Sequence, residues 1–513
     1  MKKFKTSVFI VMVGTLLSKV LGLIREVLLA QKYGTGYISD SFILSLNIPT
    51  VVISAVATAI LNNYIPLFSK AEKESEERAA KLNGNLIIIF FIISTILVML
   101  FMVFTKPIVK IFAAGFDDNA LQYLINLSRI TIFCMYFIIM AHILRGFLEF
   151  KGKFMGTAIY GVLLNTGMIL GIVLSSVENY QILGLGVLLG YILAFIALFI
   201  IAKLNKFSAK LNFNIKDSYF KELVVLTVPI LLNDVVWQIN GVVDKSIAST
   251  IGEGYISAIN YSHYIVDMIT SVFATSIVTV FFPNVIKTFR DDGIKAVKHK
   301  TNIILKTIIF VSIPCTILIS AYSEAIVRLL FFRGAFDESS LQITSMAVSI
   351  YSLAIVFVSM KTILFKVFYA LQDTKSPTQS AIIAILLNIV LSIAFVKPFG
   401  YIGIIVATII SSIVSTFLLI RRFNIKHEKL IDKELWKNII RVIIAGVLML
   451  VVILLVNKLT AGIFVINELM SSIIKAIIGG ICGGIVYLVL LFIMKFDFKL
   501  RSGESTLWEY LPY

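Results

Sequence analysis

Residues 84–105, GNLIIIFFIISTILVMLFMVFT, contain no charged side chain. A run of roughly 20 apolar residues is what a helix needs to cross a bilayer. The rest of the chain is similar, since 59% of its 513 residues are hydrophobic, 15% are charged, and the mean hydropathy is +0.97. A soluble domain is about 45–50% apolar and about 25% charged. The composition therefore predicts an all-α polytopic membrane protein and excludes soluble enzymes, disordered scaffolds and nucleic-acid-binding modules.

Comparable apolar runs recur along the chain and predict fourteen transmembrane helices. The first run is too long for a cleavable signal peptide and contains three charged residues. The predicted spans are 6–30, 38–68, 84–105, 122–146, 154–176, 181–203, 220–248, 255–287, 301–323, 340–370, 378–396, 400–421, 437–457 and 471–494.

The net charge of +17 is distributed unevenly between the predicted loops. With the N-terminus inside, 33 of the 46 Lys and Arg residues fall in inside segments and 7 in outside loops. Cytoplasmic loops of membrane proteins carry this excess, so the bias predicts that both termini are cytoplasmic. The basic residues are then topology signals that contact anionic membrane lipids, rather than a nucleic-acid site.

The chain repeats itself at an offset of about 220 residues. Residues 36–39, GYIS, recur at 254–257, and the Asn that ends Leu163-Leu164-Asn165 recurs in Leu386-Leu387-Asn388. The repeat contains six spans, an even number, so the halves are parallel repeats. The predicted organisation is a six-helix lobe (1–203), a cytoplasmic linker (204–219), a second six-helix lobe (220–421), a basic loop (422–436), two extra helices (437–494) and a cytoplasmic tail (495–513). Such lobes are typical of an alternating-access transporter.

Charged residues within spans are costly and are functional candidates by default. Lys19 and Glu26 are seven positions apart and share a helix face, and Arg25 lies next to Glu26. We interpret Arg25 as a cavity residue, because a mid-span Arg requires water or an anion. Asp40 at the start of the second span either caps that helix or pairs with a cation of the first.

The second half carries its own charged positions. Asp244 and Lys245 fall where Arg25 and Glu26 fall in the first half, His263 lies in the eighth span and Lys361 in the tenth. Because the Arg fork suits phosphate oxygens, these cations favour an anionic, phosphorylated substrate. The chain has no GxxxxGK[ST] motif for ATP, so we expect an ion gradient, the membrane potential or the substrate gradient to supply the energy.

Several stretches then resemble one family, the MurJ (MviN) family of lipid II flippases within the MOP exporter superfamily. They cover nearly the whole chain, and the run at 368–377 between the tenth and eleventh spans is the most specific of them. The stretches are 18–26, 33–35, 39–42, Pro49, Pro66, 333–337 and FYALQDTKSP at 368–377.

The resemblance implies a function and a set of site residues. The protein would not be an enzyme, but would move undecaprenyl-pyrophosphate-linked disaccharide-pentapeptide between the leaflets of the bacterial inner membrane. Its lipid tail would lie along the two extra helices. The substrate-binding candidates are Arg25, Lys19, Glu26, Asp40, Lys245, His263 and Lys361. The sequence departs from the family at 48–55 and 261–264, where further cavity arginines are usual and none is present.

Some family members resemble sodium-coupled exporters, which implies a cation site formed by helices 7, 11 and 12. The matching residues are Asp244, Asn388, Ser392 and Thr408, whose hard oxygen atoms suit Na⁺. Ser392 stands where a carboxylate is usual. A sodium site and an ordinary charge network around Asp244 and Lys245 are equally favoured by the sequence.

Three other functions remain open. The nearest is a flippase for another undecaprenyl-linked glycan, and the second is a MATE-like cation:drug antiporter, although a drug exporter should carry acidic rather than cationic cavity residues. The third is a non-transporting membrane scaffold, which the mid-span Arg25 and the intact duplication disfavour. No cofactor other than a coupling ion is implied, and we expect a monomer.

Overall fold

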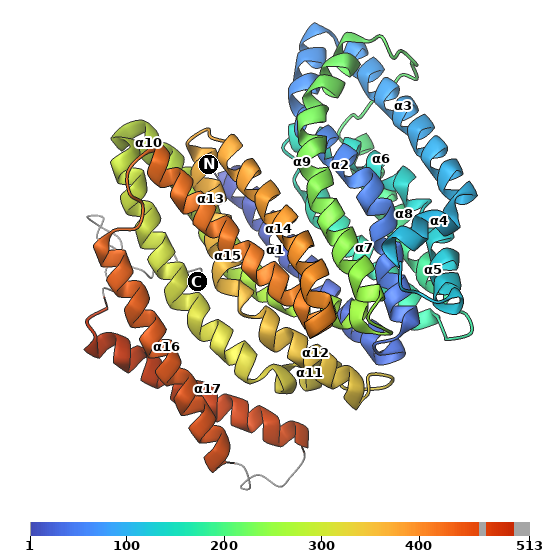
Figure 1. The fold of residues 1–513 in the computed structure, drawn as a ribbon. Coiled ribbons are helices and arrows are strands. Elements are labelled where there is room, and N and C mark those ends of the chain that lie inside the picture. The colour runs from blue at the N-terminus through green and yellow to red at the C-terminus, as the bar shows by residue number, and fades with distance from the viewer. Residues whose placement is uncertain (1, 461–467, 497–513) are drawn as a thin grey trace. The chain divides into compact units, whose positions relative to one another are not determined.

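The computed structural model describes residues 2–460 and 468–496, and these are helical with no strand (Figure 1). The predicted tail at 495–513 lies almost wholly outside the described residues. The first nine helices are α1 (Lys2–Tyr33), α2 (Tyr37–Glu74), α3 (Glu76–Val103), α4 (Thr105–Phe112), α5 (Asp118–Thr131), α6 (Cys134–Phe150), α7 (Met155–Leu174), α8 (Gln181–Leu204) and α9 (Ser218–Ser249). The remaining eight are α10 (Tyr255–Ala321), α11 (Ser323–Phe331), α12 (Glu338–Tyr351), α13 (Ala354–Ala370), α14 (Lys375–Phe399), α15 (Tyr401–Lys426), α16 (Lys433–Leu459) and α17 (Glu468–Ile493).

The prediction of an all-α polytopic membrane protein is confirmed. Within the described ranges, eight helices are long and apolar enough to cross a membrane, or ten if each of two bent helix pairs is one span. The exact count of fourteen spans is not confirmed. The bent pairs are α5 with α6, at 41°, and α12 with α13, at 46°. Each pair falls on one predicted span, so hydropathy located these segments without detecting the bend within them.

The duplication read from the sequence is visible in the local structure. Helices α5 and α12 both have 14 residues, and α6 and α13 both have 17. Asp117 and Asp337 cap α5 and α12, accepting hydrogen bonds from the backbone N–H groups of Ala120 at 2.7 Å and Ser340 at 2.8 Å. An Asp at this position satisfies an N–H that the helix itself cannot pair.

One helix joins two predicted spans. Helix α10 contains a break at Gly293, whose φ of 75° and ψ of −169° are not helical. A left-handed φ is easily adopted only by glycine, which explains why the chain turns here. The break falls between the predicted spans 255–287 and 301–323.

The chain forms two compact units, each described here by itself. Unit 1 comprises Met1–Ser257 together with Arg333–Phe336, and unit 2 comprises Ala258–Phe332 together with Asp337–Tyr513. In unit 1, α9 packs against α2, α3 and α4. The repeat places residues 220–248 in the second lobe, whereas their packing in the structure groups them with unit 1. The lobe boundaries derived from the repeat therefore remain a prediction.

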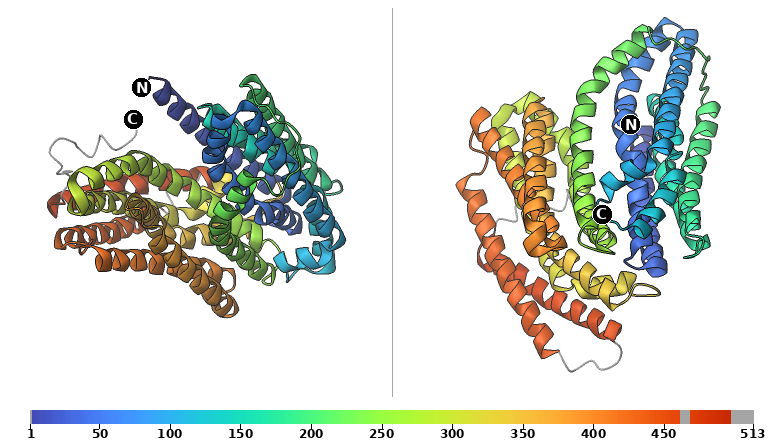
Figure 2. Two further views of the ribbon diagram at one scale, coloured as in Figure 1. Left: turned by 90° about the horizontal axis from the view of Figure 1, so that it is seen from above. Right: turned by 45° about the vertical axis from the view of Figure 1, so that its right-hand side comes forward.

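Within unit 2, the two extra helices pack together and are bound to α10. The Tyr322 hydroxyl donates to Asn457 Oδ1 at 3.1 Å, and Tyr487 donates to the Phe310 carbonyl at 2.8 Å. A Cβ atom at Gly479 would meet the Tyr322 hydroxyl oxygen at 1.8 Å. The glycine therefore permits the close approach of α17 to Tyr322, the residue between α10 and α11. Figure 2 shows α16 and α17 side by side in both views.

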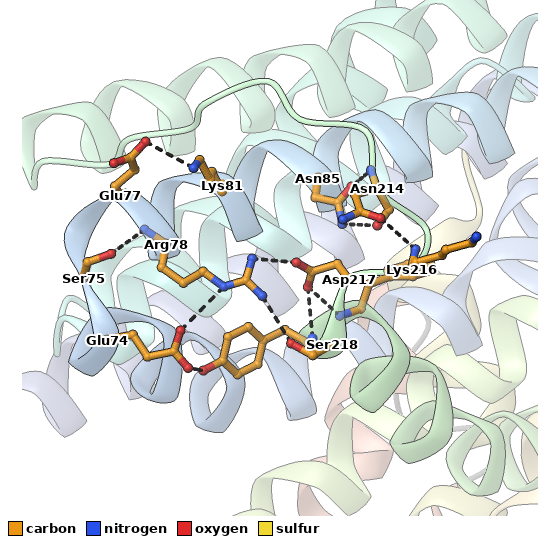
Figure 3. Close-up of polar contacts among 12 residues, drawn as sticks. Glu74, Ser75, Glu77, Arg78, Lys81, Asn85, Asn214, Lys216, Asp217 and Ser218 are labelled. Atoms are coloured by element: carbon orange, nitrogen blue, oxygen red, sulfur yellow. Dashed lines mark hydrogen bonds and ion pairs between the residues drawn. The ribbon is translucent and has the colours of Figure 1, made fainter.

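The linker between α8 and α9 is bound to the protein rather than loose. Its residues 208–217, which we call the linker strap, cross the start of α3 (Figure 3). Arg78 donates from Nη1 to Asp217 Oδ2 at 2.6 Å, and Asp217 Oδ1 accepts from the backbone N–H of Tyr219 at 2.9 Å. Asp217 thereby caps α9 and binds it to α3 at the same time.

Candidate functional site

Arg25 and Glu26 of α1 form the centre of the candidate substrate site, and α7 completes it. The Arg25 guanidinium pairs with the Glu26 carboxylate, and the two side chains are only 16% and 3% exposed. Arg25 Nη1 also lies 3.3 Å from Asn165 Oδ1 and 3.3 Å from Met168 Sδ. The arrangement keeps a cation with a planar fork of donors inside the helical bundle, where an anion can replace part of its pairing.

Small residues bring α1 close enough to α7 for these contacts. A Cβ atom at Gly14 would lie 2.2 Å from Ala158 Cβ, and one at Gly161 would lie 2.3 Å from Ser18 Oγ. Asn165 Nδ2 donates to the Ser18 carbonyl at 3.0 Å. Close helix packing through small residues is common in membranes, and here it fixes the asparagine that orients Arg25.

The other predicted cations lie on different helices. Lys19 is on α1 and partly exposed, and Lys245 is on α9 of unit 1 and also partly exposed. In unit 2, Lys361 is on α13, and the His263 ring lies 5.3 Å from the ring of Tyr351. The structure brings Arg25 and Glu26 together in unit 1, and the roles of the remaining cations stay predictions.

Asp40 makes neither of the two contacts that the sequence suggested. Its side chain is completely buried, and the cap of its own helix is Gly36, without a side-chain hydrogen bond. Its carboxylate instead accepts from the backbone N–H groups of Gly254 at 2.8 Å and Ser257 at 2.7 Å. Asp40 therefore caps the start of α10, which the sequence could not reveal because the partners are more than 200 residues away.

Two loops of unit 1, one from each half of the repeat, contact the first helix of the opposite half in equivalent ways. The backbone N–H of Gly115 donates to Ser249 Oγ at 3.0 Å, near the end of α9. The backbone N–H of Ala335 donates to the Gln31 carbonyl at 2.8 Å, near the end of α1. Each loop of one half thus contacts the first helix of the other half.

The predicted sodium ligands are divided between the units. In unit 2, Asn388 Nδ2 donates to Thr408 Oγ1 at 3.1 Å, and Asn388 and Ser392 are buried. Asp244 belongs to unit 1, where Asn240 donates to it at 3.2 Å. Across the described residues no group of three or more His, Cys, Asp or Glu side chains could hold a metal ion. The unit 2 residues supply neutral oxygen atoms that suit Na⁺, and only Asp244 would add charge.

Sequence reasoning missed residues that the structure places beside the charged cluster. Asn165 and Met168 contact Arg25, and the recurrence of Asn165 as Asn388 was the available signal for the asparagine. Arg145 of α6, near the end of the predicted span 122–146, was not among the candidates, yet its side chain is 15% exposed and its guanidinium lies 5.1 Å from the centre of the Tyr160 ring. A charge at the edge of an apolar run cannot be assigned to bundle or loop from hydropathy.

The specific run at 368–377 forms a charged contact outside the spans. Burial opposes ionisation of Asp373, but hydrogen bonds from Lys426 Nζ at 2.6 Å and from Ser376 outweigh it and lower the pKa of Asp373 to about 2. The contact joins the turn before α14 to the end of α15 within unit 2. It thus fixes this turn at the helix ends.

We expect the Asp373 contact to stabilise the protein at neutral pH. Since its pKa is lowered on folding from about 4, the stabilisation is present above pH 4 and is lost as the pH falls toward 2. The Asp373→Asn variant should melt below wild type at pH 7, and the difference should narrow between pH 4 and pH 2 in a calorimetric series. A difference independent of pH would contradict this role.

The family model described as lipid II flippase MurJ matches residues 29–503 of the chain. The chain belongs to the MurJ family of lipid II flippases. The match begins just after Glu26, so it includes α2 with Asp40 and both repeats, but not the start of α1. The resemblance recognised from the sequence motifs is confirmed.

Similar proteins agree with this membership. The probable lipid II flippase MurJ of Vibrio cholerae is 27% identical over 469 residues, covering 87% of this chain and 88% of that protein. Its counterpart in Rickettsia prowazekii is 24% identical over 448 residues, covering 86% of this chain and 88% of that protein.

Solved structures show the same MurJ fold. A lipid II flippase MurJ in an inward closed conformation matches with a TM-score of 0.82 and 28% identity, covering 95% of this chain and 99% of that one. An inward-facing MATE family transporter of the MOP superfamily matches with a TM-score of 0.69 and 12% identity, covering 80% and 95%. The second likeness extends the fold, but not the function, to the superfamily.

Proposed function

We propose that this chain flips lipid II, the undecaprenyl-pyrophosphate-linked peptidoglycan precursor, from the inner to the outer leaflet of the bacterial cytoplasmic membrane. Membership of the MurJ family and the nearly buried Arg25 together support the proposal. The observation that carries it is the pairing of Arg25 with Glu26 and Asn165, because a guanidinium inside an apolar bundle suits a pyrophosphate more than a neutral or cationic drug.

In this mechanism Arg25 exchanges partners. Before substrate binding it is held by Glu26 and Asn165, and the pyrophosphate then takes over part of its donor set. Lys19, Lys245, Lys361 and His263 are further candidates for contacts with the head group. A substrate drives the change between inward-open and outward-open states only if it binds them with different affinity.

Asp40 has a positioning role in the proposal. Its bonds to Gly254 and Ser257, together with the docked loops at Gly115 and Ala335, join the two halves at the predicted outer ends of their first helices. We propose that these contacts form when the outer side closes and break when it opens. Asp40 therefore acts on the conformational equilibrium rather than on the substrate.

The remaining parts of the proposal concern placement in the membrane. The excess of basic residues in inside segments supports cytoplasmic N- and C-termini. Many apolar side chains of α16 and α17 are exposed, including Leu454, Leu455, Ile481, Ile485 and Phe492, which suits a path for the lipid tail. We propose that the chain works as a monomer and performs no catalysis.

A sodium gradient is the proposed energy source, with Asp244, Asn388, Ser392 and Thr408 as ligands. Coupling free energies of about 1–3 kcal/mol correspond to effects of ~5–150-fold. In vesicles, wild type should therefore flip lipid II faster with an inward sodium gradient, and Asp244→Asn should flip at one rate with or without it. Asn388→Ala is the matched variant in unit 2. Gradient-independent flipping by wild type would remove the sodium site.

Complementation tests the proposed function directly. A strain depleted of its own lipid II flippase should grow when this chain is expressed. The chain carrying both Arg25→Ala and Glu26→Gln, expressed and inserted to the same level, is the control. Failure of the well-expressed wild-type chain would instead favour another undecaprenyl-linked glycan as the substrate, which the absence of arginine from residues 48–55 and 261–264 allows.

A further inference from the structure

The linker strap carries apolar side chains that face away from the protein. Leu211, Phe213 and Ile215 are 79%, 56% and 57% exposed. They occupy every second position of the strap, and Ile215 lies in the turn that the Asp217 backbone N–H closes on the Asn214 carbonyl at 3.2 Å. A contiguous set of exposed large apolar side chains is costly in water and marks a surface that something else covers.

Contacts with α3 explain why these side chains cannot turn inward. The backbone N–H of Asn214 donates to Asn85 Oδ1 at 2.8 Å, and Asn85 Nδ2 donates back to the Asn214 carbonyl at 3.0 Å (Figure 3). The Lys210 backbone N–H donates to the Ala80 carbonyl at 2.9 Å. A Cβ atom at Gly84 would lie 1.8 Å from the Lys210 carbonyl oxygen, so the strap lies directly on the glycine. The polar backbone thus faces α3, and the apolar side chains face out.

The position of the strap along α3 fixes its depth relative to the membrane. The uncharged apolar run of α3 begins at Leu86, the residue after Asn85. The strap contacts residues 78–85, the two turns that precede this run. With a rise of about 1.5 Å per residue, Phe213 and Ile215 lie within about two turns of the expected hydrocarbon boundary. That is the depth at which amphipathic segments bury their apolar side in the head-group region.

The positive charge in and just before the linker strap indicates that an anionic surface covers its apolar side chains. Residues 204–216 contain Lys206, Lys210 and Lys216 and no Asp or Glu. The three lysines are exposed. Basic residues beside interfacial apolar side chains attract anionic lipid head groups. Lys210 pairs with Glu77 of α3 at 3.0 Å. We propose that the linker strap is an interfacial anchor, which inserts Leu211, Phe213 and Ile215 into an anionic membrane leaflet and binds its head groups through Lys216 and, just before the strap, Lys206. With both termini in the cytoplasm, as the basic residues predict, this leaflet is the cytoplasmic one.

Site-directed spin labelling of the full chain in vesicles tests the anchor. In a background with Cys134→Ala, Cys315→Ala and Cys482→Ala, a nitroxide is attached at Phe213→Cys. Matched labels stand at Asp292→Cys, exposed beside the Gly293 break, and at Leu454→Cys on the exposed apolar side of α16. Collision with oxygen relative to a water-soluble nickel chelate reports depth. The ratio at 213 should be severalfold above that at 292 and below that at 454.

Lipid composition and two variants separate the two parts of the proposal. The 213 label should lie deeper in phosphatidylcholine vesicles containing phosphatidylglycerol than in pure phosphatidylcholine, and Lys206→Gln with Lys216→Gln should reduce this difference. Gly84→Ala, which displaces the strap from α3, should change the depth at 213 while the label at 454 stays unchanged and reports correct folding. A 213 label as accessible to nickel as the 292 label in both lipids would overturn the anchor and favour a protein partner. An equal depth in both lipids would overturn the role of the lysines.

Discussion

Replacing Arg25 by alanine should abolish lipid II flipping while the chain still inserts. The guanidinium pairs with Glu26 inside the bundle and is the cation proposed to receive the pyrophosphate. Truncating one partner of a buried, hydrogen-bonded charge pair weakens binding by about 2–5 kcal/mol. A loss of 2 kcal/mol already weakens head-group binding by roughly 30-fold. Flipping in vesicles, normalised to the amount of protein inserted, measures the effect.

The Arg25 variant needs two controls because it also affects stability. Glu26 is only 3% exposed, and losing its ion-pair partner leaves a buried carboxylate at a cost of about 3–5 kcal/mol. The double variant Arg25→Ala with Glu26→Gln removes that charge and should restore stability without restoring flipping. Arg25→Lys keeps a charge but not the fork, so it should flip slowly. Normal flipping by the stable double variant would show that Arg25 does not contact the substrate.

Replacing Asp40 by alanine should have the second largest effect, and it should act on stability and conformation together. The backbone N–H groups of Gly254 and Ser257 would lose their acceptor in a buried place. Each unsatisfied buried donor costs about 1–3 kcal/mol. We therefore expect a clear drop in melting temperature and faster hydrogen exchange of these two amides, with flipping reduced because the outer side no longer closes.

A graded comparison separates this role from ordinary helix capping. Asp40→Asn keeps one acceptor oxygen and should fall between wild type and Asp40→Ala. Asp117→Ala removes the cap of α5 in the same unit, at a cost of about 0.5–2 kcal/mol, and should leave exchange at 254–257 unchanged. If Asp40→Ala slowed flipping without altering exchange at these amides, a direct substrate role for Asp40 would replace the positioning one.

The sequence predicts the fold because the apolar runs and the internal repeat can both be recognised from the order of residues alone. Runs such as 84–105 locate membrane helices, and the 220-residue offset anticipates the matched lengths of α5 with α12 and α6 with α13. The two bends were missed because a kinked helix and a straight one have the same composition. The grouping of α9 with unit 1 is not readable from the repeat, because packing depends on contacts between segments far apart in the sequence.

The site was predicted unevenly for a similar reason. Arg25 and Glu26 stand out because charge inside an apolar run is rare, and their adjacency makes the pairing readable. Met168 carries no such signal, and the only signal for Asn165 is its recurrence as Asn388, since neutral polar and thioether side chains are common in helices. Asp40 was predicted as a site residue, but its partners are the backbone N–H groups of residues 254 and 257. Every residue except proline has a backbone N–H group, so no pattern of residue types identifies such a partner.

The docked loops give the chain an internal pseudo-symmetry. Residues 115 and 335 are equivalent by the repeat, and so are their hosts 249 and 31, at offsets of 220 and 218. In each case the backbone N–H of the loop donates to the end of the other half's first helix. Reciprocal contacts between equivalent positions are the signature of a two-fold symmetric dimer. The pair of docked loops therefore has the form of a two-fold symmetric dimer interface built within a single chain.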